Sequence, residues 1–419
     1  MLTATRTHFQ PHIASEVAPL RQVVVHTPGR ELSLVSPENR LELLFDDILF
    51  EHKARQEHEL MCQLFTRIVG QDDAVLQIRD LLLETFYIPE AREYLVEELI
   101  RTMPERNLQA FKSDLLAFTP EELMEFVLTG RSILPIHALP LPNLMFTRDL
   151  CAVVQDRIIL SKAATAARAR ESVLIRTIFY YHPGFEPWRD HIITLPETVT
   201  FEGGDLLVAS SNLVLLGHSE RTSFGAVMEL ARKLLYETSV EHVLVVDVPK
   251  RRASMHLDTV FTFCDYDTCV YYPPIIKEEL YNVMHLTAEE SPMHLKSEVY
   301  PCLHVALQEL LDRELTYIPC GGEDPLNQAR EQWTDGANLF AITPGVVVGY
   351  ERNLHTFNAL KEAGFQVTST RAFLDYYTET PFRGGERIAI KLEGNELSRG
   401  RGGPRCMTMP LTRQAEPQA

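Results

Sequence analysis

Five segments in the later part of the chain share one design, and this recurrence restricts the fold more than any other feature of the sequence. Each segment opens on an acidic residue or a cysteine and continues into two short apolar runs that a turn separates, as in a β-hairpin. The segments open at Asp149, Asp205, Asp258, Asp335 and Cys406, and the C-terminus truncates the last one. Their intervals are uneven, so the recurrence is a structural echo and not a strict repeat. A ring of such β-rich units would bring the leading side chains together at its centre.

The residues before these segments are predicted to be mainly helical. A first strand is expected at Gln22–His26, and a helix is expected to begin at Ser36, because serine followed by proline is typical of a helix N-terminus. From about residue 53 to 133 the apolar spacing is helical almost throughout. Within this stretch Thr119 opens a capping box with proline at the first helical position.

The length and this change of character predict two structural units. A chain of 419 residues exceeds the usual size of one domain. We expect residues 71–137 to form a helical domain, and residues 1–70 and 138–419 to form a catalytic α/β domain.

Composition excludes several classes of function. The net charge of -18 argues against a nucleic-acid-binding protein, since such binding requires neutralisation of phosphates. No apolar run is long enough to span a bilayer, and residues 1–6 lack the apolar core of a signal peptide, so a cytoplasmic protein without membrane contact is expected. The acidic balance weakly favours a cationic substrate.

Seven cysteines are scattered along the chain, and one of them has an unusual setting. An odd number without zinc-type spacing is expected for reduced cysteines, and no metal or cofactor is predicted. Cys406 follows two glycines and a proline, and Arg401 and Arg405 flank it. Nearby positive charge favours the thiolate that acts as a nucleophile. A lone cysteine is more often a small buried apolar residue than a nucleophile. A catalytic role for Cys406 therefore depends on the other motifs of the chain.

Three further motifs supply acids and a histidine. Asp149 ends the motif Asn-Leu-Met-Phe-Thr-Arg-Asp, and Glu202 opens Glu-Gly-Gly-Asp, in which paired glycines allow a close approach to the backbone. In Met-His-Leu-Asp, His256 and Asp258 would share one face if the segment is a strand. Taken singly, Asp149 is more often a turn residue, Glu-Gly-Gly-Asp can be a β-turn with two exposed acids, and His256 with Asp258 is as well explained by a satisfied polar pair at a strand edge.

Together these motifs predict nucleophilic catalysis on a cation. A thiol and an imidazole suit attack at an electrophilic carbon. The surplus carboxylates indicate that this carbon belongs to a positively charged group, and a guanidinium matches carboxylates through its planar fork of donors.

The same motifs carry a resemblance to a known family. The segments 143–149, 202–205, 255–261 and 401–407 resemble the signature motifs of arginine deiminase. The block from Glu331 to Asn338, with 344–348, resembles a further conserved block of that family. The likeness runs in order from about residue 19 to 411.

The resemblance implies a fold, a reaction and a set of roles. The fold would be a five-bladed, pseudo-symmetric α/β propeller with an inserted all-helical domain, and the reaction would convert L-arginine and water to L-citrulline and ammonium. The family also suggests a homo-oligomer, either a dimer or a tetramer. The implied catalytic residues are Cys406, His256, Glu202, Asp258 and Asp149. The implied substrate-binding residues are Asp149, Asp258, Asn143, Arg168, Arg221 and Arg401, with Arg170 as a rival to Arg168 for the substrate carboxylate and Arg401 on a mobile loop.

Two other functions remain open on the sequence. An amidinotransferase of the same superfamily would use an amine in place of water, but the helical insertion argues against it, since relatives of that type lack the insertion by resemblance. A non-catalytic binding protein on the same fold would be expected to have lost at least one of Cys406, His256, Glu202 and Asp258, and all four are present.

Overall fold

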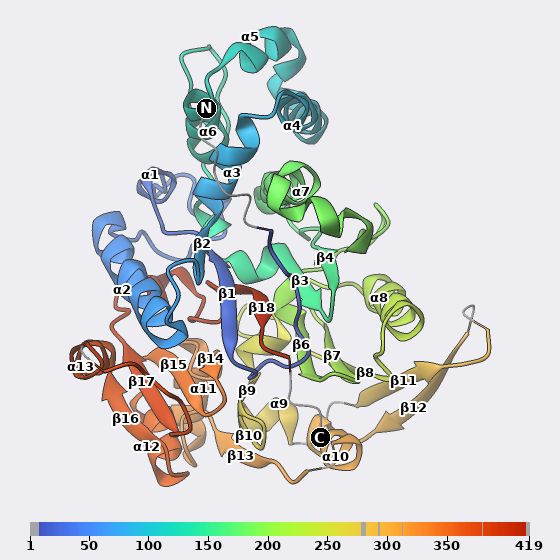
Figure 1. Cartoon of the computed structure of the whole chain (residues 1–419), viewed down its shortest axis with the longest axis vertical. Coiled ribbons are helices and arrows are strands. Elements are labelled where there is room, and N and C mark those ends of the chain that lie inside the picture. The colour runs from blue at the N-terminus through green and yellow to red at the C-terminus, as the bar shows by residue number, and fades with distance from the viewer. Residues whose placement is uncertain (1–7, 278–281, 292–293, 312, 379, 416–419) are drawn as a thin grey trace.

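The computed structural model of the chain describes residues 8–277, 282–291, 294–311, 313–378 and 380–415. Residues 1–6, which were considered above for a signal peptide, lie outside the described residues. The described strands form five separate sheets around the middle of the molecule, and most of the helices lie outside them (Figure 1). No helix in this described part is both long and apolar enough to cross a membrane.

The five sheets are small and mixed. In hydrogen-bonding order they are β18 (Met409–Arg413), β1 (Leu20–Val25) and β2 (Val75–Gln77); β3 (Cys151–Val154), β4 (Arg157–Leu160) and β5 (Ile192–Ile193); β12 (Leu295–Tyr300), β11 (Val283–Ala288), β8 (His242–Asp247), β7 (Leu213–His218) and β6 (Leu206–Ser210); β13 (Thr316–Pro319), β10 (Thr268–Tyr271) and β9 (Phe261–Asp265); and β14 (Phe340–Thr343), β15 (Val346–Tyr350), β17 (Ile388–Leu392) and β16 (Gln366–Ser369).

One structural unit recurs in these sheets. An antiparallel strand pair is followed by a helix and then by a strand that runs parallel to the second strand of the pair. Two complete examples are β3–β4–α7–β5, with α7 at Ala169–Tyr181, and β6–β7–α8–β8, with α8 at Phe224–Glu237. The unit β18–β1–α2–β2, with α2 at Glu51–Val69, uses both ends of the chain. The hairpins predicted after the first four leading residues are confirmed, and so is the strand after Cys406.

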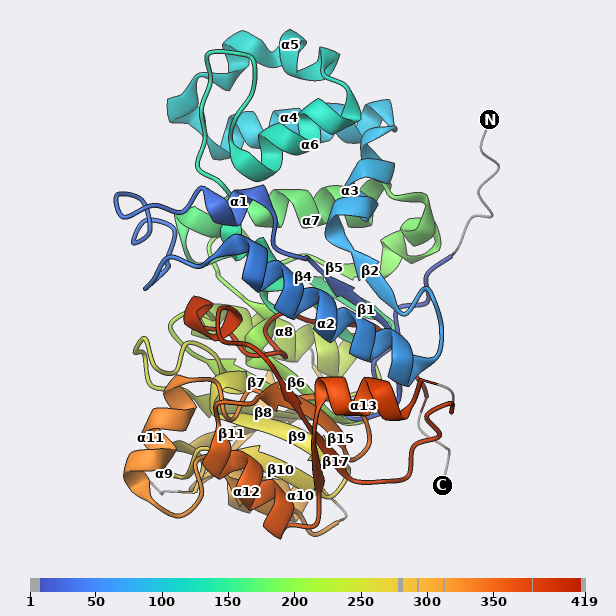
Figure 2. The ribbon, with the colours of Figure 1, turned by 90° about the vertical axis from the view of Figure 1, so that its left-hand side faces the viewer.

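The predicted helical stretch packs at one end of the molecule (Figure 2). Its capping box is confirmed, because the Thr119 side chain accepts from the Glu122 amide (3.2 Å) and the Glu122 carboxylate accepts from the Thr119 amide (2.8 Å). Its apolar core continues into α7, β3 and β4. Strand β2 also falls within 71–137, so the range starts inside a central sheet, and the division into domains stays a prediction. The helices are α3 (Ile78–Phe86), α4 (Pro89–Thr102), α5 (Lys112–Ala117) and α6 (Pro120–Thr129).

The prediction of a helix that begins at Ser36 is wrong. Residues 37–44 form turns, and Leu44 has a φ of 66°, which an α-helix does not allow. Contacts from a distant part of the chain hold this loop: Arg252 donates to the Leu44 carbonyl (2.8 Å) and pairs with Asp46 (2.9 Å). Tertiary contacts therefore override a local apolar spacing that is helical.

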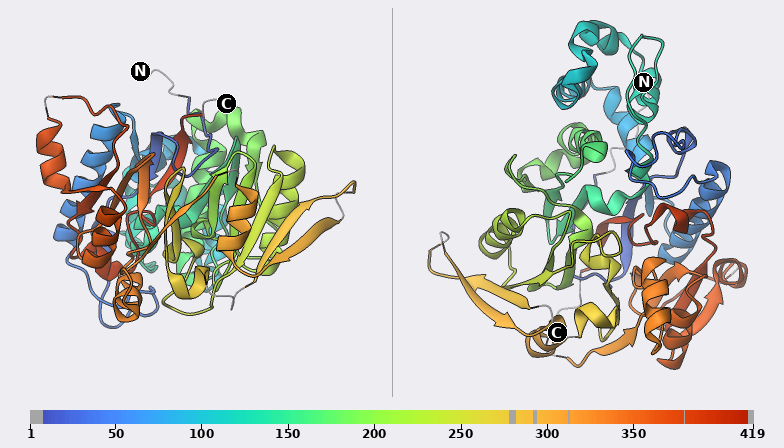
Figure 3. Two further views of the ribbon diagram at one scale, coloured as in Figure 1. Left: turned by 90° about the horizontal axis from the view of Figure 1, so that it is seen from below. Right: turned by 180° about the vertical axis from the view of Figure 1, so that it is seen from behind.

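Strands β11 and β12 depart from the recurring unit. They form a hairpin between β10 and β13, attach to the edge of β8, and project from the body of the molecule (Figure 3). The remaining α-helices are α1 (Arg30–Ser33), α9 (Pro273–Ile276), α10 (Leu303–Leu310), α11 (Pro325–Trp333), α12 (Leu354–Glu362) and α13 (Thr370–Tyr376).

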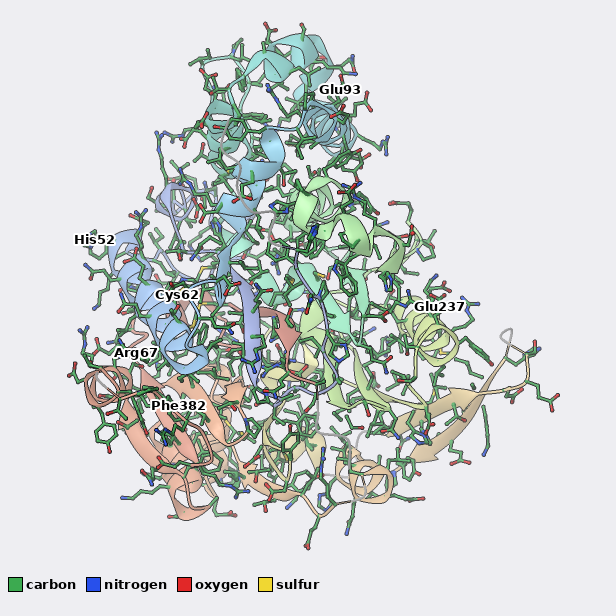
Figure 4. All side chains as sticks on the ribbon, viewed as in Figure 1. His52, Cys62, Arg67, Glu93, Glu237 and Phe382 are labelled. Carbon is green, nitrogen blue, oxygen red and sulfur yellow. The ribbon has the colours of Figure 1, made fainter. Side chains whose placement is uncertain are left out.

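Side chains fill the space between the ribbons, as Figure 4 shows for the face with α2 and the segment around Phe382. On this face α2 packs on a sheet, with the rings of Phe65 and Phe340 5.3 Å apart, and Arg67 donates to the Tyr377 carbonyl. The inner strands are buried in densely packed cores. The turns that precede these strands are therefore held in fixed positions.

Candidate active site

The turns that precede the first strands of the units meet one another. Asp149 lies in the 3₁₀ helix η4 (Thr147–Leu150), Glu202 directly precedes η7 (Gly203–Asp205), and Asp258 lies in η8 (Leu257–Thr259). Helix η7 contacts both η4 and η8, and η4 contacts β18, which follows Cys406. The convergence expected from the sequence spacing is therefore confirmed for these segments.

A cavity opens where the turns meet. All of the predicted site residues except Asp258 line it, and Asp258 is fully buried with its charge acting on Cys406. The lining residues are Leu44, Asn143, Phe146, Asp149, Arg168, Glu202, Arg221, Arg252, Met255, His256, Thr259, Gly400, Arg401 and Cys406.

His256 and Asp258 do not lie in a strand, contrary to the expectation for Met-His-Leu-Asp. His256 is extended, but the chain then enters η8, so the two side chains are not held on one pleated face. The His256 ring instead points to the other motifs. Its Nε2 lies 2.9 Å from the Glu202 carboxylate, and its Nδ1 lies 3.7 Å from Asp149 Oδ1.

These carboxylates favour a positively charged imidazole. Burial opposes the charge, but Asp149 and the hydrogen bond to Glu202 outweigh it and raise the pKa of His256 to about 10. Burial raises the pKa of Glu202. The hydrogen bond to His256 and the charge of Arg168 outweigh burial and hold this pKa below its usual range. At neutral pH the pair is therefore an ion pair, with a histidine able to donate a proton.

Asp149 and Asp258 each keep one carboxylate oxygen without a hydrogen bond among the described residues. Asp149 Oδ2 accepts from Arg168 (2.5 Å), and Asp258 Oδ2 accepts from Arg405 (2.7 Å). Asp149 Oδ1 and Asp258 Oδ1 are buried, and neither has a hydrogen-bond partner among the residues that the structure describes. Unpaired buried acceptors of this kind are costly unless a ligand satisfies them.

The surroundings of Cys406 keep its sulfur protonated, which overturns the expectation from its flanking arginines. Burial is the main cause, and the charges of Asp258 and Asp149 add to it, so the pKa of the Cys406 thiol lies well above its ordinary value. Arg405 cannot counter this effect, because Glu16 (3.0 Å) and Asp258 engage its guanidinium.

Asn338 fixes the position of the thiol. Its side-chain oxygen accepts from the Cys406 amide (3.1 Å), and its side-chain amide donates to the Asp258 carbonyl (2.9 Å). Two glycines allow this packing, since a Cβ at Gly403 would lie 2.6 Å from the Asn338 oxygen, and one at Gly204 would lie 2.8 Å from the His256 ring. The glycine pairs of both motifs are thus explained by close approach of side chains.

The structure places Arg168, and not Arg170, at the cavity. Arg170 donates to the carbonyls of Val127 and Leu139, away from the lining residues. Arg168 contacts Asp149, Glu171 (2.8 Å) and two backbone carbonyls, so its donors are already engaged. In this state Arg168 holds Asp149 in place and offers little to a further anion.

Arg221 is the better-disposed cation at the cavity. Its closest carboxylate is Glu202, at 3.9 Å, and its Nε has no hydrogen-bond partner among the described residues. Asn143 lines the cavity as predicted, but its side-chain amide donates to the Leu43 carbonyl (2.7 Å).

Asp149, Glu202 and His256 lie close enough together to hold a metal ion in principle. Arg168 already supplies positive charge to Asp149 and lies 3.7 Å from Glu202, and the protonated His256 pairs with Glu202. The trio is thus organised around its own cations, and the geometry gives no independent support for a metal.

Comparison with known proteins identifies the family. Residues 111–413 match the family model described as arginine deiminase, and every predicted site residue falls within that range. The arginine deiminase of Bacillus thuringiensis subsp. konkukian is 35% identical, with 96% of this chain and 98% of that protein covered. The chain belongs to the arginine deiminase family. The arginine deiminase of Listeria monocytogenes serotype 4a is 33% identical over the same shares of both chains.

A solved structure shows a fold that this arginine deiminase family member shares. An amidinotransferase from Microseira wollei superposes with a TM-score of 0.55 and 12% sequence identity, covering 98% of this chain and 99% of that one. The mixed α/β architecture is thus common to both proteins.

Arg252 and Met255 line the cavity of this arginine deiminase family member, and sequence reasoning missed them. Arg252 ends the basic run Lys250 to Arg252, yet it donates to the Met255 sulfur (3.1 Å) and to the loop at Leu44. The only signal for their role was their position just before His256.

Arg401 lines the cavity, and the buried Asp335 interacts with its charge. The Arg401 guanidinium stacks on Trp333, 3.5 Å from the ring centroid, and its Nε has no hydrogen-bond partner in the described structure. Burial raises the pKa of Asp335 to about 7, although Arg401 opposes this effect. Asp335 also has a φ of 63°, a conformation that asparagine tolerates as well as aspartate does.

We expect Asp335→Asn to stabilise the fold above pH 7. Because the folded-state pKa is raised, the folded protein binds more protons than the unfolded chain between about pH 4 and 7, and wild-type stability falls as pH rises through that window. The variant should gain about 1–3 kcal/mol in the free energy of unfolding at pH 8, and the gain should vanish near pH 4. Urea titrations of both proteins across this range test the prediction, and a pH-independent difference contradicts it.

Proposed function

We propose that the chain is an arginine deiminase that hydrolyses L-arginine to L-citrulline and ammonium, with Cys406 as the nucleophile. One observation carries the proposal: the Cys406 thiol and Asp149 line the cavity, Asp258 lies buried with its charge acting on the sulfur, and Asp149 Oδ1 and Asp258 Oδ1 both lack a hydrogen bond among the described residues. Family membership supports the same reaction.

The unpaired oxygens suit the guanidinium of the substrate. Its N–H groups would donate to Asp149 Oδ1 and Asp258 Oδ1, which belong to two different turns. Two anchors of this kind fix the plane of the group and present its central carbon to Cys406. Pairing would also remove the cost of leaving both oxygens unsatisfied.

Substrate binding would activate the thiol. Burial raises the pKa of the Cys406 thiol, and the charges of Asp258 and Asp149 raise it further. A bound guanidinium brings one positive charge between the two carboxylates and offsets their effect, so the pKa of Cys406 falls and the thiol proton is lost to solvent. The nucleophile would thus form mainly when its electrophile is present.

The first half-reaction forms a bond to sulfur and breaks one to nitrogen. The Cys406 thiolate attacks the guanidinium carbon and gives a neutral tetrahedral adduct. His256, charged by its pairing with Glu202, donates its proton to one –NH₂ group, which departs as ammonia and leaves a cationic thiouronium on the sulfur.

The second half-reaction consumes water. Neutral His256 takes a proton from a water molecule as its oxygen attacks the thiouronium carbon. The C–S bond then breaks and restores the thiolate, while the hydroxyl proton passes to solvent. In solvent the released ammonia takes up a proton and becomes ammonium. The ureido group of the product is uncharged, so Asp149 and Asp258 lose their charge partner and release is favoured.

A product assay tests this proposal. Incubation with L-arginine should give the ureido product and ammonium in equal amounts. A second incubation of the same protein, with an amine added to L-arginine, distinguishes an amidinotransferase. Such an enzyme would form ornithine and a new guanidino compound. Formation of ornithine without ammonium would contradict hydrolysis.

We assign the substrate α-carboxylate to Arg221, whose guanidinium is the less engaged of the two predicted arginines. Arg221→Ala should raise KM for L-arginine at least about tenfold, since a charged hydrogen-bonding pair is lost. Agmatine, which lacks the carboxylate, should be turned over equally by wild type and variant. Arg232→Ala, which removes an exposed arginine of α8, is the matched control. Equal loss with both substrates would contradict the assignment.

Three broader predictions rest on the same structure. The five sheets support an arrangement as five propeller blades around the cavity. The packing of α3 to α6 at one end supports a helical domain at 71–137. The seven free cysteines support a reducing compartment, such as the cytoplasm.

A further inference from the structure

The hairpin of β11 and β12 is the one excursion from the recurring unit that joins a neighbouring sheet. It follows β10 in the chain but extends the sheet of β8, and it projects away from the body (Figures 1 and 3). None of the hairpin residues that the structure describes lines the cavity. Its shape therefore requires an explanation other than catalysis.

Strand β12 is an open edge. In the described sheet it pairs with β11 on one side and has no strand on the other. Its four inner residues, Lys296 to Val299, are all exposed, and Val299 is 65% exposed. A strand with free N–H and C=O groups along one edge is a template for pairing with another chain.

The sequence of β12 is complementary to itself when run antiparallel. If two copies pair about Ser297, Lys296 of each lies opposite Glu298 of the other, and Leu295 lies opposite Val299. Both ionic pairs are attractive, and each apolar pair covers the exposed Val299 of one copy with the half-buried Leu295 of the other. A shift of the pairing by two residues would place two lysines or two glutamates opposite each other.

We propose that β12 is an interface with a second copy of this chain, related by a two-fold axis through Ser297. The two sheets would then continue into each other, and each contact would occur twice, as in any isologous interface. Within each copy Lys296 already pairs with Glu298 at 2.9 Å, so the dimer exchanges these two ion pairs for two between copies. Edge strands of other proteins are blunted by charges of one sign, whereas here the two signs specify one register.

Charge exchange on the full-length chain tests the interface. Sedimentation velocity of the wild type should show a dimer, and Lys296→Glu should raise its dissociation constant at least about tenfold, because two attractive pairs become repulsive. The double variant Lys296→Glu/Glu298→Lys should restore wild-type association. Lys112→Glu, at an exposed ion pair of the helical stretch, makes the same charge change as a control. Arginine turnover should be unchanged in all variants, which confirms that they fold.

A cysteine scan tests the register. Ser297→Cys should form a covalent dimer under mild oxidation, since the two residues face each other on the axis, and Leu295→Cys should not, since its counterpart lies four residues away along the strand. A monomeric wild type, a dimer that Lys296→Glu leaves unchanged, a double variant that stays weak, or cross-linking at position 295 alone would each overturn the proposal.

Discussion

Replacing Cys406 by alanine is expected to lower arginine turnover at least about ten-thousandfold, since the variant has no nucleophile to form the covalent intermediate. Asp149 and Asp258 remain in place, so the variant should still bind L-arginine. Citrulline formation measured over hours, together with calorimetric binding, gives both quantities.

The control for this variant is Cys62→Ala, which removes a half-buried thiol that does not line the cavity. It should keep near-wild-type activity. If Cys406→Ala produced citrulline at a rate similar to that of the control, direct attack by water would replace the covalent mechanism.

Replacing His256 by asparagine is expected to lower turnover by about a thousandfold. The variant cannot protonate the departing ammonia or activate water, and general acid–base groups contribute on this scale. Glu202→Gln should have a smaller effect in the same direction, because it weakens the support that raises the pKa of His256 without removing the ring. Rates at saturating L-arginine measure the effect on chemistry apart from binding.

The matched control is His52→Asn, on the exposed side of α2 (Figure 4). Because His256 is buried, near-ultraviolet circular dichroism should first confirm that its variant is folded. A folded His256→Asn protein with more than about a tenth of wild-type kcat would exclude the acid–base role.

Local sequence patterns predicted the parts of the fold that local physics decides. Each leading residue precedes a short apolar run, and the structure has a strand there because such a run buries its side chains in a sheet. The capping box at Thr119 was equally predictable, since both of its hydrogen bonds lie within four residues. The loop around Leu44 was not predictable, because Arg252 holds it from more than two hundred residues away.

For the site too, the sequence predicted what local residues decide and missed what distant contacts decide. The residue types in the motifs indicated a thiol, an imidazole and carboxylates that act together. Their electrostatics could not be read from neighbours in the sequence. Arg405 is adjacent to Cys406, yet its guanidinium pairs with Glu16 and Asp258, and burial raises the pKa of the thiol. Charge next to a residue in sequence is thus a poor guide to the field at its side chain.

The covalent intermediate on Cys406 is the central claim, and mass spectrometry of the acid-quenched enzyme tests it most directly. During turnover of L-arginine, a peptide that contains Cys406 should gain the mass of L-arginine less ammonia, and the adduct should be absent from Cys406→Ala. Absence of the adduct from wild type and from His256→Asn at every quench time, while citrulline accumulates, would contradict the account.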